Sequence, residues 1–447
     1  MTTATRPPGP KGRWPLGSLL EFRRNNLAFY ERCAREFGDV AFYRFGPKQI
    51  YQVNHPDLVE YVLVSGNRHF TKNFAIRILD PVLGNGLVSS EGNFWLRQRK
   101  LMQPAFLRPR LASYGPLMVA ATERLLATWQ DGQPRALHAD MMQLTLQIAA
   151  EVLFGADVPA DAVQIVAASA EIIQGYFADR FEGLLPVPRW LPTPGNRRLK
   201  RAVRRLDEIV YGFIKQRRAG GEDRGDLLSI LLRARDEDDG SRMTDRQLRD
   251  EVMTLFLAGH ETTALALSWA WYLLARHPDV EAKLLAELHA VLGGRTPTAA
   301  DVPRLRYAEH VMLETMRLYP PVYAFGREAA EECELGGWRV PVGANVFLVQ
   351  WTMHRDPRWF PEPARFDPDR WADGLVQRIP KYAYFPFGGG PRVCIGNTFA
   401  LMEAVLVLAT ILPRFHITLD PAHPVTPWPS ITLRPRYGIK ATVHRRP

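Results

Sequence analysis

Three consecutive glycines, Gly388 to Gly390, interrupt the chain shortly before a long apolar run. Glycine adopts backbone conformations that other residues avoid and proline cannot continue a helix, so the stretch F-P-F-G-G-G-P-R-V-C-I-G from Phe385 to Gly396 must be an irregular loop. The next residues, Asn397 to Leu412, are apolar on nearly every side, and Pro413 follows them, which predicts a buried helix. The loop therefore presents Cys394 at a helix N-terminus.

A cysteine in that position differs in chemistry from an ordinary core thiol. The unpaired N–H groups at a helix N-terminus favour the thiolate over the thiol, which makes a cysteine a metal ligand or a nucleophile. An inert buried thiol is the alternative, and we interpret Cys33 and Cys333 in that way. Three widely spaced cysteines make no disulfide framework, and we find neither a secretory segment nor an apolar run that could span a bilayer. We expect a cytoplasmic protein without a transmembrane anchor.

Composition and charge narrow the kinds of partner. The 447 residues are 46% hydrophobic and 23% charged, and no linker divides them, so we expect a single domain over residues 1–447 with an extended lead-in over about 1–15. The formal net charge is +10, but no nucleic-acid recognition motif accompanies it. An acidic protein is therefore the expected partner, and nucleic acid is not.

The loop around the cysteine carries a recognisable pattern. The sequence F-x-x-G-x-R-x-C-x-G, from Phe387 to Gly396, resembles the haem-binding loop of the cytochrome P450 family of haem-thiolate monooxygenases. The resemblance implies that Cys394 is the axial ligand of the haem iron, that Phe387 packs on the sulfur side of the haem and that Gly396 lets the backbone close over it. It also implies that Arg392 pairs with a haem propionate, with an ordinary loop arginine as the alternative. A thiolate ligand favours cleavage of the O–O bond.

A long helix is predicted from the residues after Thr244. The sequence T-D-R-Q forms a capping box from Thr244 to Gln247, and helical spacing continues to about His277, before Pro278. In its middle, A-G-H-E-T-T over residues 258–263 places small residues where a threonine hydroxyl can bond to a carbonyl one turn earlier.

This hexapeptide resembles the oxygen-binding motif of the same family. The resemblance implies that Ala258 contacts the cofactor, that Thr262 hydrogen-bonds dioxygen and that Glu261 relays the protons that O–O cleavage requires. Packing within a buried helix is the alternative for the Thr-Thr pair. We interpret His260 as structural or surface-facing.

Two further motifs concern the haem propionates and the cysteine loop. W-x-x-x-R places Trp95 and Arg99 on one helical face, and in the family this pattern, like Arg327 farther along, contacts a propionate. E-T-M-R from Glu314 to Arg317 alone predicts an ordinary surface ion pair. Beside F-D-P-D-R-W it resembles the family's buried triad, which holds the cysteine loop and here consists of Glu314, Arg317 and Arg370.

Apolar residues of three segments correspond to the substrate pocket of the family, with plain core packing as the alternative. These candidate pocket residues are Phe74, Ile78, Leu83, Leu87, Val88, Val322, Ala324, Phe325 and Ile431. The segment Phe181 to Pro194 corresponds to a mobile lid in relatives. The motifs look more like those of fatty-acid and lipophile hydroxylases than of enzymes specialised for small rigid terpenes.

The resemblance extends over nearly the whole chain. It implies a mainly helical fold with small sheets near the N-terminus and after Arg327, and haem b held between the helix of Cys394 and the helix of Thr262. Since we find no fused reductase domain, electrons from NAD(P)H should arrive through a ferredoxin or flavodoxin with its reductase. The basic residues Arg97, Lys100, Arg108 and Arg110 could dock such an acidic donor, although solvated helix faces are the alternative.

The function that follows is insertion of one oxygen atom of O2 into a lipophilic substrate, by hydroxylation or epoxidation. Fatty acids, terpenoids and steroids all remain possible substrates. The alternatives are a peroxygenase, a haem-thiolate isomerase or dehydratase, and a non-enzymatic haem sensor.

Overall fold

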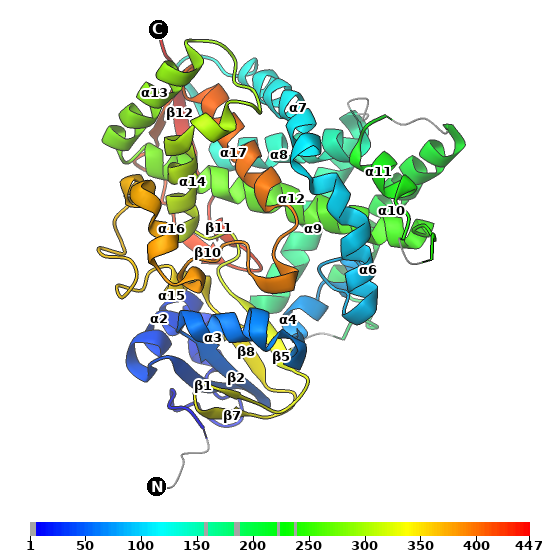
Figure 1. Ribbon diagram of the computed structural model, residues 1–447, viewed down its shortest axis with the longest axis vertical. Coiled ribbons are helices and arrows are strands. Elements are labelled where there is room, and N and C mark those ends of the chain that lie inside the picture. The colour runs from blue at the N-terminus through cyan, green and yellow to red at the C-terminus, as the bar shows by residue number, and fades with distance from the viewer. Residues whose placement is uncertain (1–5, 156–159, 183–187, 221–223, 237–238) are drawn as a thin grey trace. The chain divides into compact units, whose positions relative to one another are not determined.

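Gly46 and Pro47 turn the chain between strands β1 (Val40–Phe45) and β2 (Lys48–Val53), as the alternating sequence predicts. β2 then runs parallel to β8 (Asn345–Leu348), which comes from the last third of the chain. With β5 (Phe325–Ala329) and β3 (Phe70–Lys72) these strands form one sheet in the order β1-β2-β8-β5-β3 (Figure 1). The strands near the N-terminus and β8, which follows Arg327 in the sequence, therefore belong to one sheet.

The computed structural model describes residues 6–155, 160–182, 188–220, 224–236 and 239–447. Its contacts divide the chain into two units. We call Met1–Ile78 with Leu313–Cys394 the sheet unit, and Leu79–Met312 with Ile395–Pro447 the helical unit. The expectation of one domain over residues 1–447 stays a prediction.

The sheet unit surrounds its five-stranded sheet with short helical segments. A second, two-stranded sheet consists of β6 (Cys333–Leu335) and β7 (Trp338–Val340). The helical segments are α1 (Leu19–Arg24), α2 (Asn26–Phe37), α3 (Pro56–Glu60), the π-helical turn η1 (Tyr61–Ser65), η2 (Asn67–His69), α4 (Phe74–Arg77), α15 (Gln350–Met353), η5 (Pro368–Gly374), α16 (Leu375–Arg378), η6 (Lys381–Ala383), η7 (Gly390–Arg392) and the end of α14 (Arg306–Leu318).

The helical unit contains most of the long helices and several short helical segments. They are α5 (Asp80–Leu83), α6 (Gly92–Met102), η3 (Gln103–Phe106), α7 (Arg108–Leu126), α8 (Leu137–Phe154), α9 (Ala160–Glu182), α10 (Pro194–Gly220), α11 (Leu227–Arg233), α12 (Asp245–Leu274), α13 (Pro278–Leu292), η4 (Val302–Arg304), the start of α14, and α17 (Asn397–Ile411). Its strands are β4 (Gln133–Ala136), β9 (Phe415–Leu419), β10 (Pro427–Pro429), β11 (Leu433–Pro435) and β12 (Lys440–Arg445), and they form the sheets β4-β12-β9 and β10-β11.

α12 is the core helix of this unit and packs along α8 (Figure 1). The predicted capping box is confirmed, because the hydroxyl of Thr244 accepts from the N–H of Gln247 and the Gln247 side chain accepts from the N–H of Thr244. The helix ends at Leu274, slightly before the predicted end near His277, since His277 is already the N-cap residue of α13. The predicted mainly helical fold with small sheets is confirmed. Within the described ranges, no helix is both long and apolar enough to cross a bilayer.

Candidate functional site

The loop that carries Cys394 is shaped by glycines with positive φ. Gly388 and Gly390 have φ of 70° and 65°, a region that favours glycine. A Cβ at Gly390 would lie 1.8 Å from the carbonyl oxygen of Leu63, so η1 and the loop approach more closely than any side chain allows. The N–H of Cys394 donates to the carbonyl of Phe387 at 3.0 Å, which closes the loop.

Cys394 is exposed near the end of this loop. Gly396 is the N-cap residue of α17, which begins at Asn397. The predicted buried helix after the loop is confirmed, because α17 is buried over most of its length. Cys394 thus lies three residues before the first helical residue, Asn397, on a backbone fixed by its own hydrogen bond.

A buried histidine fixes the start of the same loop. Nε2 of His354 accepts from the N–H of Phe385 at 3.0 Å. Burial, and secondarily the charges of Arg317 and Arg355, hold the pKa of His354 well below its usual value, so the ring is neutral and can accept. Nothing in the sequence near His354 indicated this role, because the bond joins residues that are distant along the chain.

Glu314, Arg317 and Arg370 come together in the sheet unit. The Glu314 carboxylate accepts from Nε and Nη2 of Arg317, each at 2.8 Å, and from Nε of Arg370 at 3.0 Å. Indole Nε1 of Trp371 at 2.9 Å and the N–H of Asp367 at 3.0 Å complete its hydrogen bonding. Glu314 and Arg317 are 0% exposed, so the alternative of a surface ion pair is wrong.

Arg317 extends this network to the chain that leads toward the cysteine loop. Its guanidinium donates to the carbonyl oxygens of His354 at 2.9 Å, Pro363 at 2.7 Å and Arg365 at 2.9 Å. The same His354 holds the N–H of Phe385 through its ring. Glu314 is therefore connected to the start of the loop through two buried side chains.

The A-G-H-E-T-T segment lies within α12, as expected. Oγ1 of Thr262 donates to the carbonyl of Ala258 at 2.7 Å, which is the predicted bond to the preceding turn. Ala258 is exposed, whereas His260 is buried, and its carbonyl accepts from Thr145 of α8 at 2.9 Å. His260 is therefore not surface-facing, and the other half of that interpretation, a structural residue, fits its burial.

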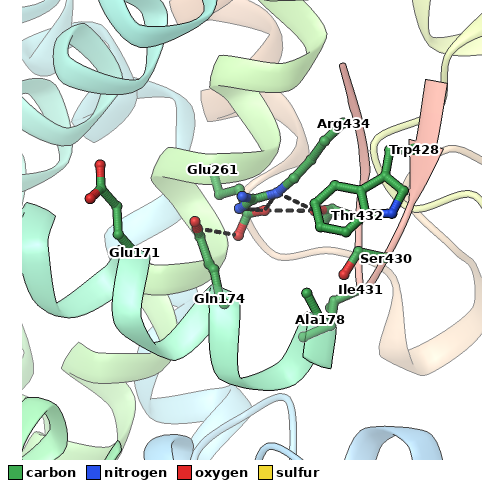
Figure 2. Close-up of a pocket in the computed structure, with 10 residues that line it drawn as sticks. Glu171, Gln174, Ala178, Glu261, Trp428, Ser430, Ile431, Thr432 and Arg434 are labelled. Carbon is green, nitrogen blue, oxygen red and sulfur yellow. Dashed lines mark hydrogen bonds and ion pairs between the residues drawn. The ribbon is translucent and has the colours of Figure 1, made fainter. Parts of the chain in front are cut away.

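Glu261 is bound on both carboxylate oxygens (Figure 2). One oxygen accepts from Oγ1 of Thr432 at 2.6 Å and from Arg434, whose Nε lies 2.8 Å away and whose Nη2 also contacts it. The other accepts from Nε2 of Gln174 on α9 at 2.9 Å. Burial alone would raise the pKa of Glu261, but the charge of Arg434 and the hydrogen bonds from Thr432 and Arg434 outweigh it and hold the pKa below its usual value. Glu261 is therefore ionised at neutral pH.

A pocket of about 210 Å³ lies against Glu261 between α9, α12 and the β10–β11 hairpin (Figure 2). It is lined by Glu171, Gln174, Gly175, Ala178, Glu261, Trp428, Ser430, Ile431, Thr432 and Arg434. Since a water takes up about 30 Å³ in the liquid and drug-sized ligands occupy pockets of at least about 300 Å³, the pocket suits solvent or part of a ligand. Of the candidate pocket residues, Ile431 lies here.

The sequence motifs do not indicate the hydrogen-bond and ion-pair partners of Glu261. Thr432 and Arg434 follow Ile431 closely in the sequence, but neither position has a local pattern that points to a residue of α12. Gln174 lies in a helical stretch with no motif. A buried carboxylate requires compensation by a cation or by hydrogen bonds, but no short pattern in the sequence identifies Arg434 as that cation.

The other predicted site residues fall into both units. In the helical unit, Trp95 is buried and Arg99 half-buried on α6. In the sheet unit, Arg327 stands on β5 with its guanidinium 5.1 Å from the ring centre of Phe325, and half-buried Arg392 ends η7.

The candidate pocket residues are similarly distributed. Phe74 lies on α4 with its ring centre 6.4 Å from that of Phe347, and Ile78 follows that helix. Val322, Ala324 and Phe325 are half-buried in the chain that enters β5. Leu83 and Leu87 are buried and Val88 is half-buried in the helical unit. Residues 183–187 of the expected lid lie outside the described residues.

Comparison with known proteins assigns the chain to a family. The family model of cytochrome P450 matches residues 7–442. Cyclooctatin synthase of Streptomyces melanosporofaciens is 40% identical over 94% of this chain and 92% of its own length. Cyclooctat-9-en-7-ol 5-monooxygenase of the same organism is 37% identical over 93% and 90% of the two chains, and pentalenene oxygenase of Streptomyces avermitilis is 36% identical over 92% and 91%.

Solved structures agree with this assignment. A retinoic acid-bound cyanobacterial CYP120A1 superposes with a TM-score of 0.87 and 29% identity, covering 98% of this chain and 99% of that one. The haem domain of cytochrome P450DA superposes with a TM-score of 0.89 and 28% identity, covering 99% and 97%. The chain belongs to the cytochrome P450 family and is a haem b monooxygenase that uses O2 and electrons from NAD(P)H delivered by redox partners.

Proposed function

We propose that this monooxygenase oxygenates a terpenoid, with Cys394 as the thiolate ligand of its haem. The observation that carries the cysteine assignment is the loop itself. The exposed Cys394 side chain stands on a backbone that two left-handed glycines and the hydrogen bond from the Cys394 N–H to the Phe387 carbonyl hold in place, three residues before α17 begins at Asn397. Soft thiolate sulfur is a ligand that haem iron accepts, so the donor fits the cofactor.

The propionates of the haem require cationic or N–H donors. The proposed donors are Arg327, Arg392, Trp95 and Arg99, on the resemblance of their sequence motifs to those of the family. Guanidinium groups bind carboxylates through paired N–H donors, which fixes orientation as well as charge. When bound, the haem activates O2 for insertion of one oxygen atom into the substrate. The triad of Glu314, Arg317 and Arg370 stabilises the fold of the loop segment.

Thr262 and Glu261 have distinct proton states in this structure. The Thr262 hydroxyl carries a proton, which it donates to the carbonyl of Ala258. The Glu261 carboxylate is ionised, with Arg434, Thr432 and Gln174 as donors. Gln174 donates to Oε2, and a carboxylate oxygen can accept a second hydrogen bond, so proton relay through Glu261 would use solvent that reaches Oε2 from the adjoining pocket.

The names of the relatives favour a terpenoid. Two of them give pentalenene and cyclooctat-9-en-7-ol as what they oxygenate. The motif comparison had pointed to fatty-acid and lipophile hydroxylases instead, but short motifs around the haem report the chemistry of oxygen more than the shape of the substrate. The candidate pocket residues are apolar, which suits either class.

For the electron donor we propose an acidic ferredoxin or flavodoxin. Lys100, Arg108 and Arg110 are exposed near the junction of α6 and α7, together with the exposed apolar side chain of Leu107. Arg97 is already paired with Asp236 at 2.7 Å and contributes less free charge. A basic patch with an apolar centre suits docking of an acidic protein.

The test is optical. The reduced wild-type protein with carbon monoxide should show the red-shifted Soret band of a thiolate-ligated haem, and Cys394→Ser should bind haem without that band. The ferric protein is then titrated with cyclic terpenes, terpene alcohols and fatty acids. A terpene should shift the spin state of the haem iron at the lowest ligand concentration. A fatty acid that binds more tightly would contradict the terpenoid proposal. Turnover with H2O2 alone, without electron donors, would favour the peroxygenase alternative.

A further inference from the structure

Two consecutive acidic side chains of α12 hold the backbone of the segment 82–87. A carboxylate oxygen of Asp250 accepts from the N–H of Asn85 at 2.9 Å, and Oε2 of Glu251 accepts from the N–H of Leu87 at 2.9 Å. Asp250 is 5% exposed and Glu251 is 0% exposed. The two bonds reach alternate residues of the segment, so they fix its register as well as its position.

The preceding residue of α12 adds a third attachment. Arg249 donates to the carbonyl of Val82 at 2.8 Å and also pairs with Asp250 at 2.9 Å and with Asp207 of α10 at 2.5 Å. Three successive side chains of one helix therefore bind the backbone of the segment 82–87 at three residues. Arg249 also holds Asp250 in place while Asp250 binds the loop.

Two glycines make this approach possible. A Cβ at Gly84, where φ is 58°, would lie 2.1 Å from Oδ1 of Asp250. A Cβ at Gly86 would lie 2.1 Å from Oγ1 of Thr254, whose hydroxyl donates to the carbonyl of Asp250. Any side chain at either position would push the segment away from α12. We call the contacts of residues 249–251 with residues 82–87 the α12 clasp.

We propose that Asp250 and Glu251, through the α12 clasp, are positioning residues that determine substrate selection. The clasp fixes the backbone from which Leu83, Leu87 and Val88 project. The same helix carries Glu261 and Thr262, about 16 Å farther along by the usual rise, so the loop and the acid–threonine pair share one rigid support. This inference rests on the proposed function, in which these three side chains line the substrate pocket.

Glu251→Ala in the holoenzyme tests the proposal. Two readouts are needed: hydrogen–deuterium exchange of the amides of residues 82–90, and spectral titration with imidazole and with the bulky azole econazole. We expect exchange at these amides to rise about tenfold or more, because the Leu87 N–H loses its acceptor. We expect econazole to bind about tenfold more weakly while imidazole, which needs only the iron, binds as in wild type.

Three further variants keep the test decisive. Glu251→Gln retains an acceptor oxygen and should restore both readouts, whereas Glu251→Asp is a methylene shorter and should reproduce the loss if the alanine variant does not load haem. Asp245→Ala removes an exposed carboxylate of the same helix, paired with Arg218, and should change neither.

Unchanged exchange in Glu251→Ala would overturn the clasp itself. Faster exchange with an unchanged ratio of the econazole and imidazole dissociation constants would overturn the role of the clasp in substrate selection. Neither outcome resembles failure of the proposed function, which would appear as loss of the thiolate signature in the wild-type protein.

Discussion

Nε of Arg434 lies 2.8 Å from the carboxylate of Glu261, and this ion pair ties β11 to the middle of α12. Both side chains are largely buried, at 17% and 14% exposure. The acid of the A-G-H-E-T-T motif is thus held in its ionised form by a residue from the end of the chain.

Removal of Arg434 should leave a buried charge without its cation. We expect Arg434→Ala to lower the free energy of unfolding by about 3 kcal/mol at pH 7, which thermal or urea unfolding measures. Since the pKa of Glu261 is lowered in the fold, its contribution is present above the unfolded pKa and is lost as pH falls through the folded value. The difference between wild type and variant should therefore shrink toward acid pH. Arg436→Ala, at an exposed arginine nearby, is the control. A difference in unfolding free energy between wild type and Arg434→Ala that stays constant with pH would contradict this account.

Glu314→Ala should give protein without stably bound haem. The substitution leaves Arg317 and Arg370 with uncompensated charges, and removing one partner of a buried pair costs about 3–5 kcal/mol. The ratio of Soret to protein absorbance after purification measures the loss. Glu332→Ala, which removes an exposed carboxylate paired with Arg339 in the same unit, should keep full haem content. A stable, fully loaded Glu314→Ala protein would refute the prediction.

Glu251 should make the stability of the protein fall as pH rises from the unfolded pKa of a glutamate toward about 8. Burial, partly opposed by the hydrogen bond from Leu87, raises the pKa of Glu251 to about 8. Its contribution to stability is therefore full below the unfolded pKa and declines by about 1.4 kcal/mol per pH unit until it is lost above about 8. Melting temperatures of wild type and Glu251→Gln from pH 5.5 to 9 provide the measurement. The glutamine variant should show the shallower decline, and parallel curves would speak against titration of Glu251.

Gly390→Ala should prevent the cysteine loop from forming. The new methyl group would overlap the Leu63 carbonyl at 1.8 Å, in addition to the strain of an alanine at φ of 65°. Gly343, in the same unit, has φ of 78° but open space around it, so Gly343→Ala isolates the backbone strain of about 1–2 kcal/mol. We expect Gly390→Ala to lose the thiolate signature and Gly343→Ala to keep it. Equal behaviour of the two variants would mean that the contact with Leu63 is not essential.

Local signals in the sequence predicted the local structure well. The capping box at Thr244, the turn at Gly46 and the buried helix after Gly396 each depend on a few adjacent residues, and each is present. The bond from Thr262 to Ala258 follows from helix geometry alone and is also present.

Contacts between residues that are distant along the chain could not be predicted from such local signals. The pairing of β2 with β8 joins Val53 to Leu348, and nothing in either strand specifies the other. The contacts of Arg434 with Glu261 and of His354 with Phe385 are of the same kind. The identity of such a partner depends on tertiary packing, which one sequence does not encode in any short window.

The close approach of Gly390 to Leu63 also bears on synthesis of the chain. The first 78 residues are synthesised early, but the sheet unit is complete only after residues 313–394 have also been synthesised. The cysteine loop cannot dock on η1 until Gly390 has left the exit tunnel. Nascent chains that stop short of this point should therefore fail to capture haem, and cofactor loading becomes a late event that follows translation of nearly the whole protein.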